Sequence, residues 1–157
     1  MKLLRLKITD TNGFRSLQSG FEYRFRSEWD LEEEKGFAPF VCAGPNGSGK
    51  SNLLEALAAI FYHMECIYLE NLPDSFRYDE DNNPGGFRSE TATPDGFEIE
   101  YLIRPQDALK TKGHDGQAHV RIVKQPGDAP KWFLLNHEEQ EGAVELTSGQ
   151  SLDRQLP

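Results

Sequence analysis

One segment of this chain has the residue types and the spacing needed to bind a phosphate. It matches the phosphate-binding template GxxxxGK[ST] at every fixed position. The segment consists of Gly44, Pro45, Asn46, Gly47, Ser48, Gly49, Lys50 and Ser51. Its glycines allow positive φ angles and place no Cβ where a phosphate would lie. We expect Lys50 to reach the β- and γ-phosphates of a nucleotide and the Ser51 hydroxyl to hold Mg²⁺.

A strand and a helix must flank this loop if it is to work. The apolar run Phe40 to Ala43 predicts a buried strand that leads into the loop. The residues that follow predict a helix from about Ser51 to Tyr68. Strand, glycine-rich turn and helix are the setting in which this motif binds phosphate, because the positive end of the helix dipole then faces the anion.

The predicted helix carries an apolar stripe at a spacing of about 3.6 residues, which indicates packing against a sheet. The stripe consists of Leu53, Leu57, Ile60, Met64 and Ile67, and Leu54, Ala58 and Phe61 are expected to widen it. The lone His63 is expected on the polar face of the helix rather than as a metal ligand.

Residues 44–57 closely resemble the Walker A segment of the RecF/SMC/OLD-like branch of ABC-type ATPases. That branch has Asn after the Lys-Ser pair, as Asn52 here, where many transporter ATPases have Thr. It also opens with a strand and a Phe-Arg-Ser pattern, as Phe14-Arg15-Ser16 here. The resemblance covers residues 1 to about 68 and is weak beyond them. Some restriction-system-associated ATPases of bacteria look similar.

The resemblance implies ATP and Mg²⁺ as ligands, with Lys50 as the catalytic residue of the loop. It implies that Asn52 and Arg15 also approach the nucleotide. For Arg15, the alternative that it is an ordinary surface arginine with no role in binding has equal weight. In this branch, hydrolysis takes place in a head-to-head homodimer, and the complete proteins act in DNA repair, genome maintenance or defence. DNA would be engaged through regions that these 157 residues do not include.

The resemblance implies an α/β fold, that of the N-terminal lobe of a P-loop NTPase of the ABC type. We expect a mixed sheet with an antiparallel β-subdomain. Alternating apolar residues predict strands at 2–9 and 21–26 as a hairpin-like pair, and a β-meander over 97–135. Residues 1–68 would hold the strand pair, the loop and the helix. Residues 69–96 would form a polar loop or insertion, and residues 136–157 a polar tail without a closing element.

Two further segments resemble known motifs, a calcium-binding loop and the ABC signature, but each lacks a feature that the motif requires. Asp79, Asp81, Asn83 and Glu90 fall at the ligand positions of a calcium loop, but Pro84 stands where that loop needs a positive-φ glycine. Residues 146–150 resemble the ABC signature Leu-Ser-Gly-Gly-Gln. We interpret them as a chance match, because no amphipathic helix precedes them and Pro157 follows soon after.

Composition narrows the classes of protein further. The net charge is −9, which argues against a surface that coats DNA, although residues 1–26 hold six basic residues against two acidic ones. We interpret that stretch as solvated strand faces rather than as a nucleic-acid patch. The two cysteines form neither a disulfide framework nor a metal site, which favours a reducing, cytoplasmic setting. No apolar run is long enough to span a membrane.

One expected feature of an active ATPase is missing. No run of four apolar residues ending in Asp-Glu follows the loop, so nothing would hold Mg²⁺ from a Walker B strand or activate water. The chain is therefore interpreted as the N-terminal lobe of a longer ATPase. The alternatives are a transporter-type ABC ATPase, disfavoured by Asn52 and the Phe14-Arg15-Ser16 pattern, and a regulatory module that binds nucleotide without hydrolysis.

Overall fold

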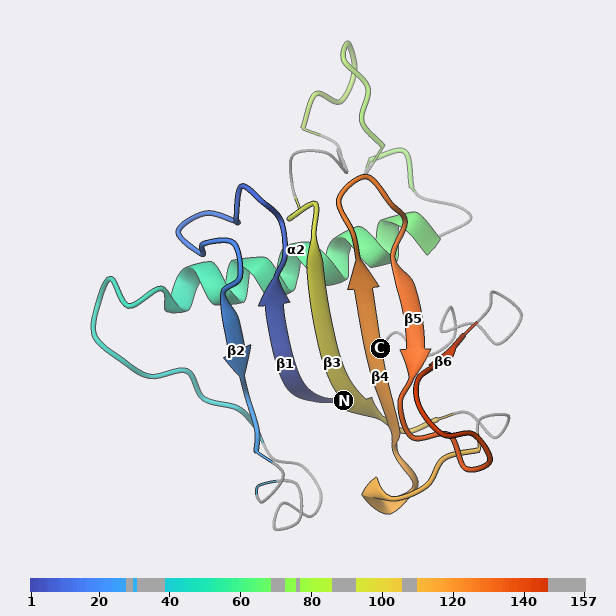
Figure 1. Ribbon diagram of the computed structural model, residues 1–157. Coiled ribbons are helices and arrows are strands. Elements are labelled where there is room, and N and C mark those ends of the chain that lie inside the picture. Colours follow the sequence, from blue (N-terminus) through green and yellow to red (C-terminus); the bar gives the residue numbers. More distant parts are fainter. Residues whose placement is uncertain are drawn as a thin grey trace.

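The computed structural model describes residues 1–27, 30, 39–68, 73–75, 77–85, 93–105 and 110–146. Within these residues, a six-stranded sheet has one long helix lying across one of its faces (Figure 1). The strands lie in the order β2-β1-β3-β4-β5-β6. Their bounds are β1 Lys2–Ile8, β2 Glu22–Arg24, β3 Phe97–Ile103, β4 Ala118–Lys124, β5 Lys131–Leu134 and β6 Val144–Glu145.

Every neighbouring pair of these strands is antiparallel, which corrects the prediction of a mixed sheet for the part of the chain described. The α/β class, the β1–β2 pair and the meander β3-β4-β5 are confirmed. A short 3₁₀ turn, η1 (His114–Gly116), precedes β4. The sheet thus grows mainly through antiparallel pairing of sequence neighbours, which needs only short connections.

Alternation of apolar and charged residues explains how the sheet is oriented. In β1, Leu6 and Ile8 are fully buried under the helix, whereas Arg5 and Lys7 lie on the opposite face. The register with β3 shifts between Leu3 and Arg5, which marks a β-bulge near the start of β1. One sheet face is therefore apolar and covered, and the other is charged.

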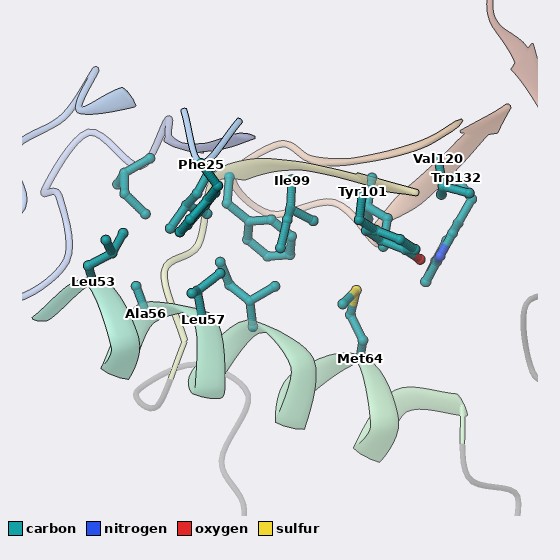
Figure 2. Packing of buried hydrophobic residues seen from close by; sticks show 14 of the residues in the cluster. Phe25, Leu53, Ala56, Leu57, Met64, Ile99, Tyr101, Val120 and Trp132 are labelled. Carbon is teal, nitrogen blue, oxygen red and sulfur yellow. The ribbon is translucent and has the colours of Figure 1, made fainter. Parts of the chain in front are cut away.

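Helix α2 (Lys50–Tyr68) supplies the apolar layer that covers the sheet, within one residue of its predicted start. Leu53, Leu57, Ile60 and Met64 are buried against β-strand residues such as Ile99 and Tyr101, as Figure 2 shows for most of them. The predicted stripe is confirmed for these four positions. The side chain of Ile67 lies outside the described residues.

The buried face of the helix differs from the predicted stripe. It lacks Leu54 and Ala58, and it includes His63. Leu54 is 55% exposed, and Ala58 is exposed as well, because both point away from the sheet. Phe61 is half-buried against the core. The prediction that His63 lies on the polar face is wrong: its side chain is 2% exposed, since it follows Ile60 by three residues and faces the same way.

The predicted strand before the phosphate-binding loop is the main correction. Residues 39–45 form no strand, and no backbone hydrogen bond joins residues 40–43 to the described part of the chain. Phe40 packs edge-on against Phe25 at 5.1 Å between ring centroids, whereas Val41 is 78% exposed. The apolar run is present and Phe40 lies against Tyr23 of the edge strand β2, but the contact is made by side chains and not by a backbone ladder.

The C-terminal half holds one element that the sequence did not predict. In the tail expected to lack a closing element, β6 pairs with β5, and the Leu146 N–H donates to the Trp132 carbonyl at 2.9 Å. The signature-like pattern falls mostly on residues 147–150, outside the described residues. In the described residues, we find no helix with the length and apolar character needed to span a membrane.

Candidate nucleotide-binding loop

The loop at residues 44–51 connects the extended segment 39–43 to the first turn of α2 (Figure 1). Gly47 and Gly49 have φ angles of 81° and 86°, values that favour glycine over any other residue. The Leu53 N–H donates to the Gly49 carbonyl at 3.0 Å, so the N–H groups before Leu53 are left at the open end of the helix. This end carries the positive side of the helix dipole.

The Lys50 side chain folds back over the loop. Its ammonium donates to the Gly44 carbonyl at 2.7 Å, to the Pro45 carbonyl at 2.7 Å and to Ser48 Oγ at 3.2 Å. Within the loop, the Ser48 N–H also donates to the Pro45 carbonyl at 3.3 Å. Lys50 is thus the side chain that ties the two ends of the loop together.

The Phe-Arg-Ser turn lies on the first turns of α2, next to the loop. Arg15 Nε donates to Glu55 Oε1 at 2.8 Å, and its guanidinium lies 5.3 Å from the centre of the Phe14 ring. The Asn52 amide donates to the Ser16 hydroxyl. The structure therefore brings Arg15 and Asn52 to the helix end that carries Lys50, where each contacts another side chain of the protein.

Arg15 holds its position with an unusual backbone. Its φ angle is 55°, which is uncommon for a residue with a side chain. The surrounding turn is closed by two backbone hydrogen bonds between Phe14 and Leu17, at 2.8 and 2.9 Å. Strained residues of this kind persist where the neighbouring contacts fix them, and they concentrate at functional sites.

Ser51 is the residue of the loop that the sequence predicts to hold Mg²⁺. Ser51 is exposed at the start of α2, where its hydroxyl could reach a magnesium ion held by a nucleotide. The described residues hold no group of three or more His, Cys, Asp or Glu side chains arranged for a metal ion. In the loop that resembles a calcium site, Asp79 Oδ1 instead accepts the N–H groups of Asp81 and Asn82 at 2.9 Å.

A second cluster of charged side chains lies on the open face of the sheet. Glu100 accepts hydrogen bonds from Arg121 at 2.8 Å, from Arg5 at 3.1 Å and from His119 at 3.1 Å. Arg5 also contacts Glu98 and Glu22. Burial raises the pKa of Glu100, but the hydrogen bond from His119 and the charges of Arg121 and Arg5 outweigh it and lower the pKa to about 2. The cluster is an ion-pair network that stabilises the sheet face.

His63 and Lys124 are two further buried polar side chains, 2% and 7% exposed. Lys124 donates to Asp95 Oδ1 at 2.7 Å, and burial together with the Lys124 charge lowers the pKa of His63. Neither residue lies in the phosphate-binding loop. His63 therefore adds a buried imidazole to the core rather than a group to the candidate site.

No protein-family model matches this chain.

The sequence analysis identified the loop but assigned no contact to two side chains beside it, Ser16 and Glu55. Glu55 follows Asn52 by three residues and Ser51 by four, so it lies on the same side of α2 as both. That spacing was visible in the sequence. What the sequence did not reveal is that the turn at Phe14–Leu17 folds onto this side of the helix.

Proposed function

We propose that this chain binds MgATP through residues 44–51 and serves as the nucleotide-binding lobe of a RecF/SMC/OLD-like ATPase. The complete loop motif at the start of α2, with positive φ angles at Gly47 and Gly49, carries the proposal. In this proposal the loop N–H groups and Lys50 hold the phosphates, and Ser51 holds Mg²⁺. Arg15 and Asn52, which lie on the same end of the helix, would contribute from the side.

Two exposed apolar side chains near the loop support the proposal that this chain is one lobe of a larger ATPase head, in which such side chains would be covered. Val41 is 78% exposed and Leu54 is 55% exposed, and both lie close in sequence to the loop. An extended segment with an exposed apolar residue and unpaired backbone groups is suited to pair with another strand. The proposal therefore includes a further strand that pairs with the segment 39–43, and a head-to-head homodimer that completes the site.

The first prediction tests nucleotide binding itself. Titration calorimetry should detect MgATP binding to the wild-type chain and none to Lys50→Ala, because the variant loses the cation that faces the β- and γ-phosphates. Lys131→Ala is the matched control, since Lys131 is an exposed lysine on β5. Equal ATP affinity for the wild type and Lys50→Ala would contradict the proposal.

The second prediction separates binding from hydrolysis. The isolated 157 residues should hydrolyse ATP negligibly, because they offer no Walker B carboxylate to position water and Mg²⁺. A phosphate-release assay on the wild type and Lys50→Ala measures this directly. Turnover of about 1 s⁻¹ that depends on Lys50, an ordinary enzyme rate, would mean that a catalytic carboxylate exists elsewhere in the chain.

Binding without hydrolysis would leave a second function open, that of a regulatory nucleotide-binding module. The same missing carboxylate favours it. The two functions differ in what the complete protein does: a strand ending in Asp-Glu beyond residue 157 would favour the ATPase.

A further inference from the structure

A pair of histidines lies at the lower end of the sheet in Figure 1, far from the loop at the start of α2. His114 is the first residue of η1, and His119 follows it on β4. Their rings meet edge to face, with 5.7 Å between ring centres and 87° between ring planes. His114 is exposed and His119 is half-buried, so a solute can reach the pair from the His114 side. Neither side chain has a part in the proposed nucleotide site.

The backbone holds His114 in a conformation that few residues adopt. The four successive residues from Gly113 to Gly116 all have positive φ angles, of 69°, 49°, 53° and 78°. Histidine and aspartate, which fill the two inner positions, tolerate this region better than most residue types. The turn is closed by a hydrogen bond from the Gly116 N–H to the Gly113 carbonyl at 3.0 Å. Strain of this kind persists where neighbouring contacts enforce it, and it concentrates at functional sites.

A buried asparagine fixes both ends of this turn. Asn136, which is 7% exposed, donates to the Lys112 carbonyl at 2.9 Å and to the Gln117 carbonyl at 2.8 Å. Its Oδ1 accepts the backbone N–H of His119 at 2.8 Å. One side chain thus ties the turn that carries His114 to the strand that carries His119. The two rings are therefore preorganised, which lowers the cost of ordering them when a ligand binds.

Glu100 determines which nitrogen of His119 is left for a ligand. His119 Nε2 lies 3.1 Å from Glu100 Oε2. Because an ionised carboxylate only accepts hydrogen bonds, Nε2 of the neutral ring carries the proton and Nδ1 keeps its lone pair. Metal-binding histidines characteristically donate their other N–H to a carboxylate in this way. Two imidazoles on one tetrahedral zinc ion have ring centres roughly 5–6 Å apart, given Zn–N bonds of about 2.0–2.1 Å. The rings of His114 and His119 have this separation.

We propose that His114 and His119 form a binding site for a zinc ion. His119 binds the ion through Nδ1, His114 supplies the second imidazole, and water completes the tetrahedral shell. Imidazole ligands suit zinc, whereas Mg²⁺ prefers oxygen ligands, so this site is independent of the Mg²⁺ that Ser51 would hold with a nucleotide. Bound zinc cross-links the turn 113–116 to β4 and holds the strained backbone in place.

Titration calorimetry with Zn²⁺, on the chain without a histidine tag, tests the site. The wild type should bind Zn²⁺, and His114→Asn and His119→Gln should each weaken binding at least about tenfold, because loss of even an outer-shell partner typically costs this much. Asparagine is chosen at position 114 because it tolerates positive φ angles. His137→Gln is the matched control and should bind as the wild type does, since His137 Nδ1 accepts the Glu139 N–H instead.

NMR spectra of the imidazole nitrogens identify the ligand atom. Zn²⁺ should shift His119 Nδ1 while Nε2 keeps its proton, and Mg²⁺ at the same concentration should leave both rings unchanged. Ligation through Nε2 would contradict the role given to Glu100. A wild type that binds Zn²⁺ no more tightly than the His114 and His119 variants would overturn the proposal, because any zinc would then be bound elsewhere in the chain.

Discussion

At the scale of single residues, two kinds of charged group behave differently in this molecule. Lys50 and Arg15 lie in exposed surroundings, where solvent weakens each contact and a charged ligand can replace it. Glu100 is different, because its side chain is 10% exposed and is surrounded by Arg5, His119 and Arg121. Groups of the first kind can exchange partners, whereas Glu100 is fixed and contributes to stability.

The third prediction concerns the pH dependence that Glu100 confers. Its pKa of about 2 lies below the ordinary value of 4.5, so the ionised form favours the folded state. This contribution is fully present above pH 4.5 and is lost as the pH falls toward 2. At about 1.4 kcal/mol per pKa unit, it amounts to at most about 3.5 kcal/mol.

Urea unfolding from pH 7 to pH 2 measures this effect. Glu100→Gln should be less stable than the wild type at neutral pH, and the difference should shrink as the pH falls through the interval. Glu145→Gln on β6 is the control, because Glu145 is exposed. A deficit in Glu100→Gln that stays constant down to pH 2 would show that packing, and not charge, is responsible.

At the scale of elements, α2 has one face that packs against the sheet and stabilises the fold, and another face that is exposed to solvent. Ile60 is fully buried against the sheet, whereas Leu54, six residues earlier, is 55% exposed. The same helix also begins at the phosphate-binding loop, so its docking on the sheet fixes where the helix end and Lys50 lie. Loss of this docking would therefore disturb the candidate site as well as the core.

The fourth prediction compares these two faces. Ile60→Ala should lower the free energy of unfolding by about 2–5 kcal/mol, because it leaves a cavity in the core. Leu54→Ala should change it by no more than about 0.5 kcal/mol, because its side chain is mostly in water. Thermal or urea unfolding of both variants measures the difference. Similar losses in the two would mean that Leu54 is covered in solution.

Elements governed by local pattern could be predicted from the sequence. The strands β3, β4 and β5 and the helix α2 follow from alternation and from the 3.6-residue stripe, which depend on one buried face. Residues 40–43 are a continuous apolar run and form no strand, because an apolar run does not by itself fix the backbone hydrogen bonds that a strand needs. The short strand β6 was not predicted, because its two residues are too few to show an alternating pattern. It forms because β5 provides a strand with which it pairs.

The candidate site was likewise predictable where it depends on local sequence, and not where it depends on long-range contacts. Residues 44–51 are recognisable because a phosphate-binding loop needs fixed residue types at a fixed spacing. The Arg15–Glu55 pair was not, because the two residues are 40 positions apart and meet only when the turn at 14–17 folds onto α2. His63 was misplaced because a histidine gives no sign of burial by its type alone, although its spacing from Ile60 did.

At the scale of the whole molecule, several basic side chains of the described residues lie next to carboxylates. The chain carries a net charge of −9, and its most basic stretch is residues 1–26. Within that stretch, Arg5 contacts Glu22, Glu98 and Glu100, Arg15 contacts Glu55, and Arg24 contacts Glu22. The Arg5 side chain is only 14% exposed. The fold thus pairs these arginines with carboxylates rather than gathering them into a free basic patch.

The last prediction follows from this pairing: the chain alone should bind duplex DNA more weakly than about 1 µM at physiological salt. Phosphate contacts need several free Lys and Arg side chains, and each contact steepens the loss of affinity with salt. Fluorescence anisotropy with a duplex of about 30 base pairs, titrated with salt, measures both quantities. Lys2→Ala, Arg5→Ala and Lys7→Ala, combined in one variant, test the β1 residues, with Lys131→Ala as the control on β5. Submicromolar binding that only the triple variant loses would mean that DNA displaces the carboxylates from Arg5, and β1 would then be a nucleic-acid surface.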